Sequence, residues 1–130
     1  MEVLTLKKRK DFVKAAKGFK VVTNGLVLQA ALSFPAPTKE CCFAGFTATK
    51  KLGKAHIRNA TKRKLRAVVR LVLPQIALSG IDYVFIGRHN TTALEFTYLQ
   101  KRVKNAILQI NEQITEKREA YVKKVNDSSD

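Results

Sequence analysis

Short apolar runs separated by turn residues dominate the first half of the chain and indicate β-strands. The run FKVVT at 19–23 and the run LVLQAALS at 26–33 flank Asn24-Gly25, a dipeptide that tolerates positive φ and favours a tight hairpin. The prolines at Pro35–Pro37 are expected to end the second strand, because proline cannot donate a hydrogen bond to a neighbouring strand.

Two further apolar segments also have the length of strands. CCFAGFTATK at 41–50 predicts a third strand. IDYVFIG at 81–87 is a near-continuous apolar run bounded by Gly80 and Gly87, as expected of a strand that is buried on both faces. The apolar pattern therefore predicts four strands.

Apolar residues at helical spacing predict two helices around these strands. The first is expected over Lys8–Lys17, with Phe12 on its apolar side and Gly18 placed to stop it. The second is expected to begin near His56 and to end at about Leu73, because the next residue is a proline, which cannot donate the following backbone hydrogen bond.

The last third of the chain predicts one long helix. It is expected to begin at Thr97, because Thr97-Tyr-Leu-Gln100 fits a capping box, and the final NDSSD is typical of a frayed polar tail. The element order is therefore αβββαβα. A chain of 130 residues with 45% hydrophobic content fits one domain. We assign residues 1–115 to this domain and residues 116–130 to the end of the helix and the tail.

The charge of the chain indicates a polyanionic partner. Its 25 Lys and Arg against 10 Asp and Glu give a formal net charge of +15, which costs self-repulsion unless a polyanion lies nearby. Nucleic acid is the first candidate and an anionic membrane surface is the second. The charge is uneven, because no Asp or Glu occurs between Cys41 and Ile81.

The two cysteines favour a reducing compartment. Cys41 and Cys42 are adjacent, so they cannot form an ordinary disulfide with each other, and no further Cys or His stands near them to complete a zinc site. The run Met1–Leu6 is too short for a signal peptide, and no later segment approaches the length of a membrane span. We therefore expect a soluble, cytoplasmic protein.

The segment HIRNATKRKLR at 56–66 combines cations and apolar residues at helical spacing. Turning each residue by about 100° places Ile57, Leu65, Val68 and Leu71 on one side, and Lys64 falls among them, where it either reaches the edge or marks an opening in the core. The opposite side of the helix is cationic, and each pair of like charges four residues apart costs a few tenths of a kcal/mol. Contact with phosphates therefore explains this cationic side better than exposure to solvent alone. Membrane docking is disfavoured, because the core needs the apolar side. The cationic side is expected to carry Arg58, Asn59, Lys62, Arg63, Arg66 and Arg70.

Longer stretches around this segment resemble the bacterial ribonuclease P protein subunit. TATKKLGKAHIRNATKRKLR at 47–66 is similar to the family pattern T/S-K-K-x-G-x-A-x-x-R-N-x-x-K-R-x-x-R. Leu6–Phe12 is similar to the family's first helix, Val27–Gln29 to its second strand and Asp82–Arg88 to its fourth strand. The resemblance runs in the family's element order from about residue 4 to residue 108.

The resemblance implies a two-layer α+β sandwich of the ribosomal-protein-like class, with an unusual left-handed βαβ crossover. It also implies an RNA-binding protein subunit of ribonuclease P, which binds the catalytic RNA and the single-stranded 5′ leader of precursor tRNA and assists removal of that leader. Catalysis is then carried by the RNA, and Mg²⁺ is bound mainly through the RNA and the substrate. No membrane partner and no obligatory protein partner are expected.

Within this resemblance, the basic helix and the loop before it contact the catalytic RNA. Arginines can bind phosphates bidentately, Asn59 can reach a phosphate or a 2′-hydroxyl, and Gly53 allows close approach of the backbone. The residues expected to bind this RNA are Lys50, Lys51, Lys54, Arg58, Asn59, Lys62, Arg63 and Arg66.

The resemblance places the leader in a cleft between the sheet and the first helix. Phe12 can stack on an unpaired base there, although an aromatic on the apolar side of a short helix is more often a core residue. Cations around it can hold the flanking phosphates. The residues expected to line the cleft are Lys8, Arg9, Phe12, Gln29, Thr47, Thr49 and Arg88.

Three positions depart from the family pattern. The family triplet Arg-Asn-Arg ends here in Ala60, which falls toward the apolar side of the wheel; its loss of a phosphate contact predicts weaker RNA affinity. Ala16 stands where many members carry a second aromatic, and Gln29 where some relatives place one. Leader binding is therefore expected to depend more on hydrogen bonds.

The chain lacks the pattern of a protein-only nuclease, which needs clustered carboxylates to hold Mg²⁺. His56 and His89 have no neighbouring acid to orient them, so no catalytic and no metal-binding residue is expected. A ribosomal or RNA-assembly protein that binds structured RNA without a catalytic role stays open as an alternative. A helix-turn-helix DNA-binding module fits less well, because a strand precedes and follows the basic helix.

Overall fold

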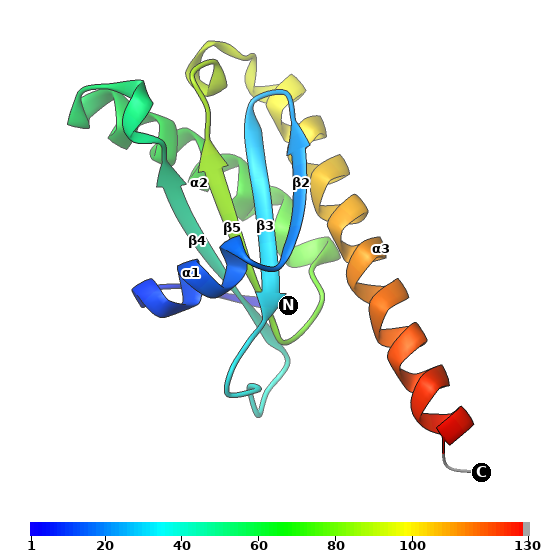
Figure 1. The fold of residues 1–130 in the computed structure, drawn as a ribbon. Helices are drawn as coiled ribbons and strands as arrows, with labels where there is room; N and C mark the ends of the chain where they lie inside the picture. The colour runs from blue at the N-terminus through cyan, green and yellow to red at the C-terminus, as the bar shows by residue number, and fades with distance from the viewer. Residues whose placement is uncertain (129–130) are drawn as a thin grey trace.

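A five-stranded mixed sheet with helices on both faces forms the body of the protein in the computed structural model, which describes residues 1–128 (Figure 1). The strands lie in the order β1-β4-β5-β3-β2. The elements are β1 (Glu2–Thr5), α1 (Arg9–Ala16), β2 (Phe19–Thr23), β3 (Leu26–Leu32), β4 (Cys41–Ala48), the 3-10 turn η1 (Lys50–Leu52), α2 (Ala55–Ile76), β5 (Ile81–Gly87), the 3-10 turn η2 (Thr91–Ala93) and α3 (Phe96–Ser128).

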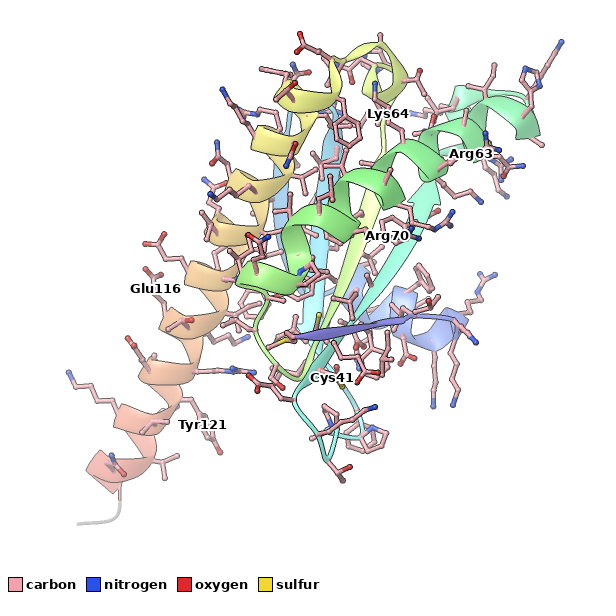
Figure 2. All side chains as sticks on the ribbon, turned by 180° about the vertical axis from the view of Figure 1, so that it is seen from behind. Cys41, Arg63, Lys64, Arg70, Glu116 and Tyr121 are labelled. Carbon is pink, nitrogen blue, oxygen red and sulfur yellow. The ribbon has the colours of Figure 1, made fainter. Side chains whose placement is uncertain are left out.

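The connection between β4 and β5 has the rare left hand. The two strands are parallel neighbours, and α2 joins them across one face of the sheet. With α2 toward the viewer and the strands pointing upward, the chain passes from β4 on the right to β5 on the left (Figure 2). A right-handed connection moves the other way. The prediction of an α+β sandwich with this crossover is confirmed: α2 and α3 form the helical layer on one face of the sheet, and the short α1 lies on the other.

The two faces of the sheet pack into separate apolar clusters. The larger cluster fills the space between the sheet, α2 and α3, and it contains the fully buried Tyr83 and Phe85 of β5. The smaller cluster lies under α1 and contains Val84 of the same strand. Because β5 contributes side chains to both clusters, it is buried on both faces, as its apolar run predicts.

Two glycines shape the path of the chain around β3. The predicted turn at Asn24-Gly25 joins β2 to β3, and Gly25 supplies the positive φ of +93°. Gly18 follows α1, where a Cβ atom would lie 2.2 Å from the carbonyl oxygen of Ala30. The chain therefore leaves α1 by passing directly over β3, and only a residue without a side chain fits there.

β1 is an element that the apolar pattern does not predict. It pairs in parallel with the first half of β4, from Glu2 opposite Cys41 to Thr5 opposite Ala44. The strand has four residues and is only partly buried, so its own sequence carries little strand signal. The observed element order is therefore βαβββαβα.

Two helix boundaries differ from the prediction. α2 does not end at Leu73 but continues through Pro74 to Ile76, although Pro74 has no N–H to donate to the Arg70 carbonyl. The capping box at Thr97 is also wrong, because α3 begins one residue earlier and the Thr97 hydroxyl donates a hydrogen bond to the Glu95 carboxylate at 3.0 Å.

α3 projects beyond the sheet (Figure 1). Ile114 is the last buried residue before position 127, so the buried core lies within the predicted domain 1–115. The helix continues to Ser128; residues 126–128 are therefore helical rather than a tail, and residues 129–130 of that tail lie outside the described residues. Across residues 1–128, no helix is both long enough and apolar enough to cross a membrane.

Candidate nucleic-acid interface

α2 carries a dense positive charge that has no internal counterpart. Within residues 1–128 the ion pairs are formed by Lys14 and Lys39, and no cation of α2 takes part in one. The repulsion among these cations is therefore relieved only by an external anion. The cations of α2 are Arg58, Lys62, Arg63, Lys64, Arg66 and Arg70.

The buried side of α2 is rotated relative to the predicted one. Ile57 and Leu71 are 39% and 51% exposed, whereas Val69 is buried. Thr61 packs so closely on Gly87, the last residue of β5, that a Cβ on Gly87 would lie 2.1 Å from the Thr61 Cγ2 atom. The turn before Thr61 therefore extends past the end of β5 and has no sheet to pack against.

This rotation changes the surroundings of two predicted RNA-contact residues, Arg58 and Lys62, and of Ala60. Arg58 and Lys62 are half-buried rather than fully exposed, and the Nε atom of Arg58 is shielded without a hydrogen-bond partner among the described residues. Ala60 is exposed, so its predicted position toward the apolar side is wrong. Asn59, Arg63 and Arg66 are exposed, as the prediction requires.

Lys64 is engaged within the protein. Its Nζ atom donates a hydrogen bond to the Thr92 carbonyl at 2.9 Å and another to the Leu94 carbonyl, in the segment between β5 and α3. Figure 2 shows Lys64 and Arg70 on opposite sides of α2. Of the two readings left open by the sequence, Lys64 therefore reaches the edge of the core and ties α2 to the start of α3.

Arg66 is held over an aromatic ring at the edge of β4. Its guanidinium carbon lies 5.3 Å from the centre of the Phe46 ring, and Phe46 stacks on Phe85 of β5 with ring centres 5.6 Å apart. The cation–π contact uses the face of the guanidinium and leaves its N–H edges available to an acceptor. This contact fixes the orientation of the Arg66 side chain, and its role in binding RNA stays a prediction.

The loop before α2 adds further cations. Lys50, Lys51 and Lys54 are all exposed. Gly53 has a φ of +91°, and nothing lies within 4 Å of the position that its Cβ would occupy, so this glycine serves the backbone conformation and leaves the loop surface open. α2 begins without a side-chain cap and without an acidic residue in its first turn. Its free N–H groups therefore add to the attraction for anions.

The other predicted surface lies on the α1 face of the sheet. A Cβ on Gly45 would lie 2.6 Å from the Phe12 Cζ atom, so the Phe12 ring rests directly on β4 and is half-buried. Gln29 and Thr47 point to the same face of the sheet by strand alternation. Val84 of β5 pairs with Gln29 on one side and with Gly45 on the other, and Thr47 is the next residue of β4 after Gly45 on that face. Phe12, Gln29 and Thr47 are therefore brought together.

The remaining predicted cleft residues lie around this group. Lys8 and Arg9 are exposed at the start of α1, and Thr49 is exposed between β4 and η1. Arg88 follows β5, and its guanidinium donates a hydrogen bond to the Thr23 carbonyl at 3.3 Å. The structure thus places Arg88 and Thr49 at one end of the sheet, and Lys8 and Arg9 at the start of α1. Their roles in leader binding stay predictions.

An ion pair that the sequence does not predict holds α1 on the sheet. The Lys14 Nζ atom of α1 lies 3.4 Å from a carboxylate oxygen of Asp82, a buried residue of β5. The other carboxylate oxygen of Asp82 accepts a hydrogen bond from the Ser33 hydroxyl at 2.6 Å. The only signal in the sequence was an acid inside an otherwise apolar strand.

A cavity of about 270 Å³ at the edge of β4 joins the two predicted surfaces. Phe12 from the cleft and Arg66 from the basic helix both line it, together with Arg70 and residues of β1. Arg70 is absent from the predicted contact residues, although it stands four residues after Arg66 and could have been found by extending that spacing. β1 forms the rest of the cavity wall, and no pattern in its sequence indicated this role.

The thiols lie away from both surfaces. Cys41 and Cys42 are buried and unpaired with each other, and burial raises the pKa of Cys42 from 9.0 to about 12. A thiol of such high pKa stays protonated and unreactive near neutral pH. No group of three or more His, Cys, Asp or Glu within residues 1–128 is placed to hold a metal ion.

The fold and its two neighbouring surfaces define a small, basic α+β protein of the RNA-binding class. A sequence model of the family named Ribonuclease P matches residues 2–111. The chain therefore belongs to the ribonuclease P protein family, and it is a protein component of the endoribonuclease that takes part in tRNA processing in association with ribonuclease P RNA. The alternative of a purely ribosomal or RNA-assembly protein is thereby set aside.

Curated relatives agree with this family. The ribonuclease P protein component of Gluconacetobacter diazotrophicus is 45% identical over 95 residues, which cover 72% of this chain and 79% of that protein. The component of Ruegeria pomeroyi is 43% identical over 91 residues, covering 70% and 72%.

Solved structures show the same fold. A mutant ribonuclease P protein from Staphylococcus aureus superposes with a TM-score of 0.67 at 24% identity, covering 83% of this chain and 87% of that one. The ribonuclease P protein from Thermotoga maritima gives a TM-score of 0.67 at 23% identity, covering 82% and 96%. The chain and these proteins thus share their architecture.

Proposed function

We propose that the protein assists removal of the 5′ leader of precursor tRNA by holding two RNAs at once. α2 and the loop before it bind the catalytic RNA, and the cleft beside α1 binds the single-stranded leader. The observation that carries this proposal is the shared cavity, which Phe12 lines from the cleft and Arg66 from the basic helix. Two RNA strands can meet there because cations reduce their mutual repulsion.

In this proposal the RNA carries the catalysis. Mg²⁺ is bound mainly by phosphates of the RNA and the substrate, and the protein contributes charge neutralisation and capture of the leader. The unpaired, buried thiols of Cys41 and Cys42 support a reducing, cytoplasmic location. No membrane and no obligatory protein partner are part of the proposal.

Reconstitution tests this function. The protein is mixed with a bacterial ribonuclease P RNA at low Mg²⁺, and cleavage of precursor tRNA is followed. We expect faster cleavage than with the RNA alone, and a larger gain for substrates with a leader of several nucleotides. Equal rates with and without protein would contradict the proposal.

Single substitutions then separate the two surfaces. Arg66→Ala should weaken binding of the catalytic RNA and change leader-length dependence little; Arg58→Ala should act in the same direction. Phe12→Ala should do the reverse, provided that its thermal unfolding shows an intact fold. Lys123→Ala, an exposed charge on the far part of α3, is the matched control and should leave both measurements unchanged.

A further inference from the structure

A second cavity, of about 510 Å³, opens on the far side of α1. Its walls come from the segment before α1, from the first turn of α1, and from the loop between β3 and β4. The first turn of α1 lies between this cavity and the cleft described above, because its Phe12 rests on Gly45 of β4, whereas the cavity reaches Phe43 and the cleft residue Thr47 lies beyond Gly45. A strand that leaves the cleft over that turn would enter the cavity next.

The cavity combines exposed cations with aromatic surface. Lys7, Lys8 and Lys10 line one wall, and all three are exposed. Phe34 lines the opposite wall at 81% exposure, the highest among the large hydrophobic side chains of the described chain. Phe43 of β4 is half-buried in the same cavity. An aromatic face left in water beside three lysines suits a base and its neighbouring phosphates.

The two acids of this cavity share one lysine of α1, Lys14. Asp82 lies 3.4 Å from the Lys14 Nζ atom and accepts the Ser33 hydroxyl, and Asp11 lies 3.9 Å from the same Nζ atom. The ion pairs within residues 1–128 do not involve the three wall lysines. The cavity therefore keeps a net attraction for an anion.

We propose that this cavity binds an unpaired nucleotide of single-stranded RNA, with its base stacked on Phe34 and its phosphates held by Lys7 and Lys10. The inference rests on the proposed function and extends it, because the occupant is a nucleotide of the leader beyond those in the cleft. A base-paired strand does not fit, since its base faces are covered by stacked neighbours. The first turn of α1 thus lies between two nucleotide sites.

Competition between substrates tests this site. Holoenzyme is assembled from the full chain and a bacterial ribonuclease P RNA, and two precursor tRNAs with a long and a very short leader are cleaved in one reaction. The ratio of their kcat/KM values measures recognition of the distal leader. Phe34→Leu should lower this preference about fivefold, the effect expected for loss of one stacked base, while Phe34→Tyr should retain it. Lys7→Ala and Lys10→Ala should lower it as well, and more weakly at high salt.

Phe96→Leu is the matched control, because Phe96 is an exposed phenylalanine at the start of α3. It should leave the preference unchanged. Equal preferences of Phe34→Leu and wild-type holoenzyme would overturn the distal site while leaving leader capture intact. A wild-type holoenzyme that shows no preference for the long leader would instead overturn the proposed function itself.

Discussion

The guanidinium of Arg66 is stacked over the ring of Phe46, 5.3 Å from its centre. One residue belongs to the basic helix and the other to the sheet edge, so the packing of the fold orients a cation that we assign to RNA. Phe46 is held in turn by its contact with Phe85. This relationship makes the RNA surface depend on an aromatic residue that does not itself need to touch RNA.

The Arg66–Phe46 contact predicts coupled effects on RNA affinity. Phe46→Leu removes the ring, and Arg66→Ala removes the cation. In a double-mutant cycle for binding to ribonuclease P RNA we expect a coupling of about 0.5–1 kcal/mol, the usual range of an exposed cation–π pair. Binding is measured by titration at fixed salt. Additive losses would mean that Phe46 does not orient Arg66.

Lys64 and Arg63 are adjacent cations with different expected roles. Lys64→Met removes hydrogen bonds to the carbonyls of Thr92 and Leu94, and it should lower the free energy of unfolding by about 1–3 kcal/mol. Arg63→Met should change stability by less than about 0.5 kcal/mol, because Arg63 is exposed. Urea denaturation measures both.

Binding to ribonuclease P RNA should be affected by Arg63→Met and not by Lys64→Met, the reverse of the effect on stability. The slope of log affinity against log salt should fall by about 1 for Arg63→Met and stay unchanged for Lys64→Met. A reduced slope for Lys64→Met in a folded protein would show that Lys64 contacts phosphate after all.

Ala60 offers a gain-of-function test. It is exposed beside Asn59, so an arginine there can extend into solvent without disturbing the core. Ala60→Arg should raise affinity for ribonuclease P RNA several-fold at moderate salt and steepen the salt dependence by about one charge. Ala60→Gln, of similar length without charge, is the control. An unchanged salt slope for the arginine variant would place this position outside the RNA contact.

Cys42 predicts a loss of stability at high pH. Burial raises its pKa from 9.0 to about 12, so the unfolded chain loses this proton first. The stabilisation is complete below pH 9 and is lost as the pH rises toward 12. Cys42→Ala should therefore show a shallower decline in its urea midpoint between pH 8.5 and about 10.5 than wild type. All other side chains are the same in both proteins, so the difference isolates the thiol; parallel declines would contradict the assignment.

Local signals predicted the strands well where turns delimit them. Asn24-Gly25 sets the hairpin, and the run 81–87 matches β5 at both ends. β1 escaped prediction because its strand character comes from parallel pairing with β4, some forty residues away, rather than from its own four residues. Pairing of that kind is tertiary information.

The orientation of α2 shows a different limit. A helical wheel gives the spacing of apolar residues but does not show which of them contact the sheet. Ile57 was predicted to face the core, but it is exposed because the first turn of α2 lies beyond the end of β5. The family resemblance supplied the candidate residues, whereas the structure added Arg70, Phe46 and the Lys14–Asp82 pair. Helical periodicity places Arg70 on the cationic side of α2, but it indicates neither Phe46 nor the Lys14–Asp82 pair.

The shortness of β1 has a consequence for the behaviour of the free protein. Pairing with β1 stops at Ala44, so on that side β4 has no partner strand from Gly45 to Ala48 within the described part of the chain. An open strand edge is a template for another copy, and surrounding cations keep copies apart. The positive charges that attract RNA thus also oppose self-association, because they repel other copies of the protein. Salt that screens them should make the isolated protein aggregate, and bound RNA should keep it dispersed.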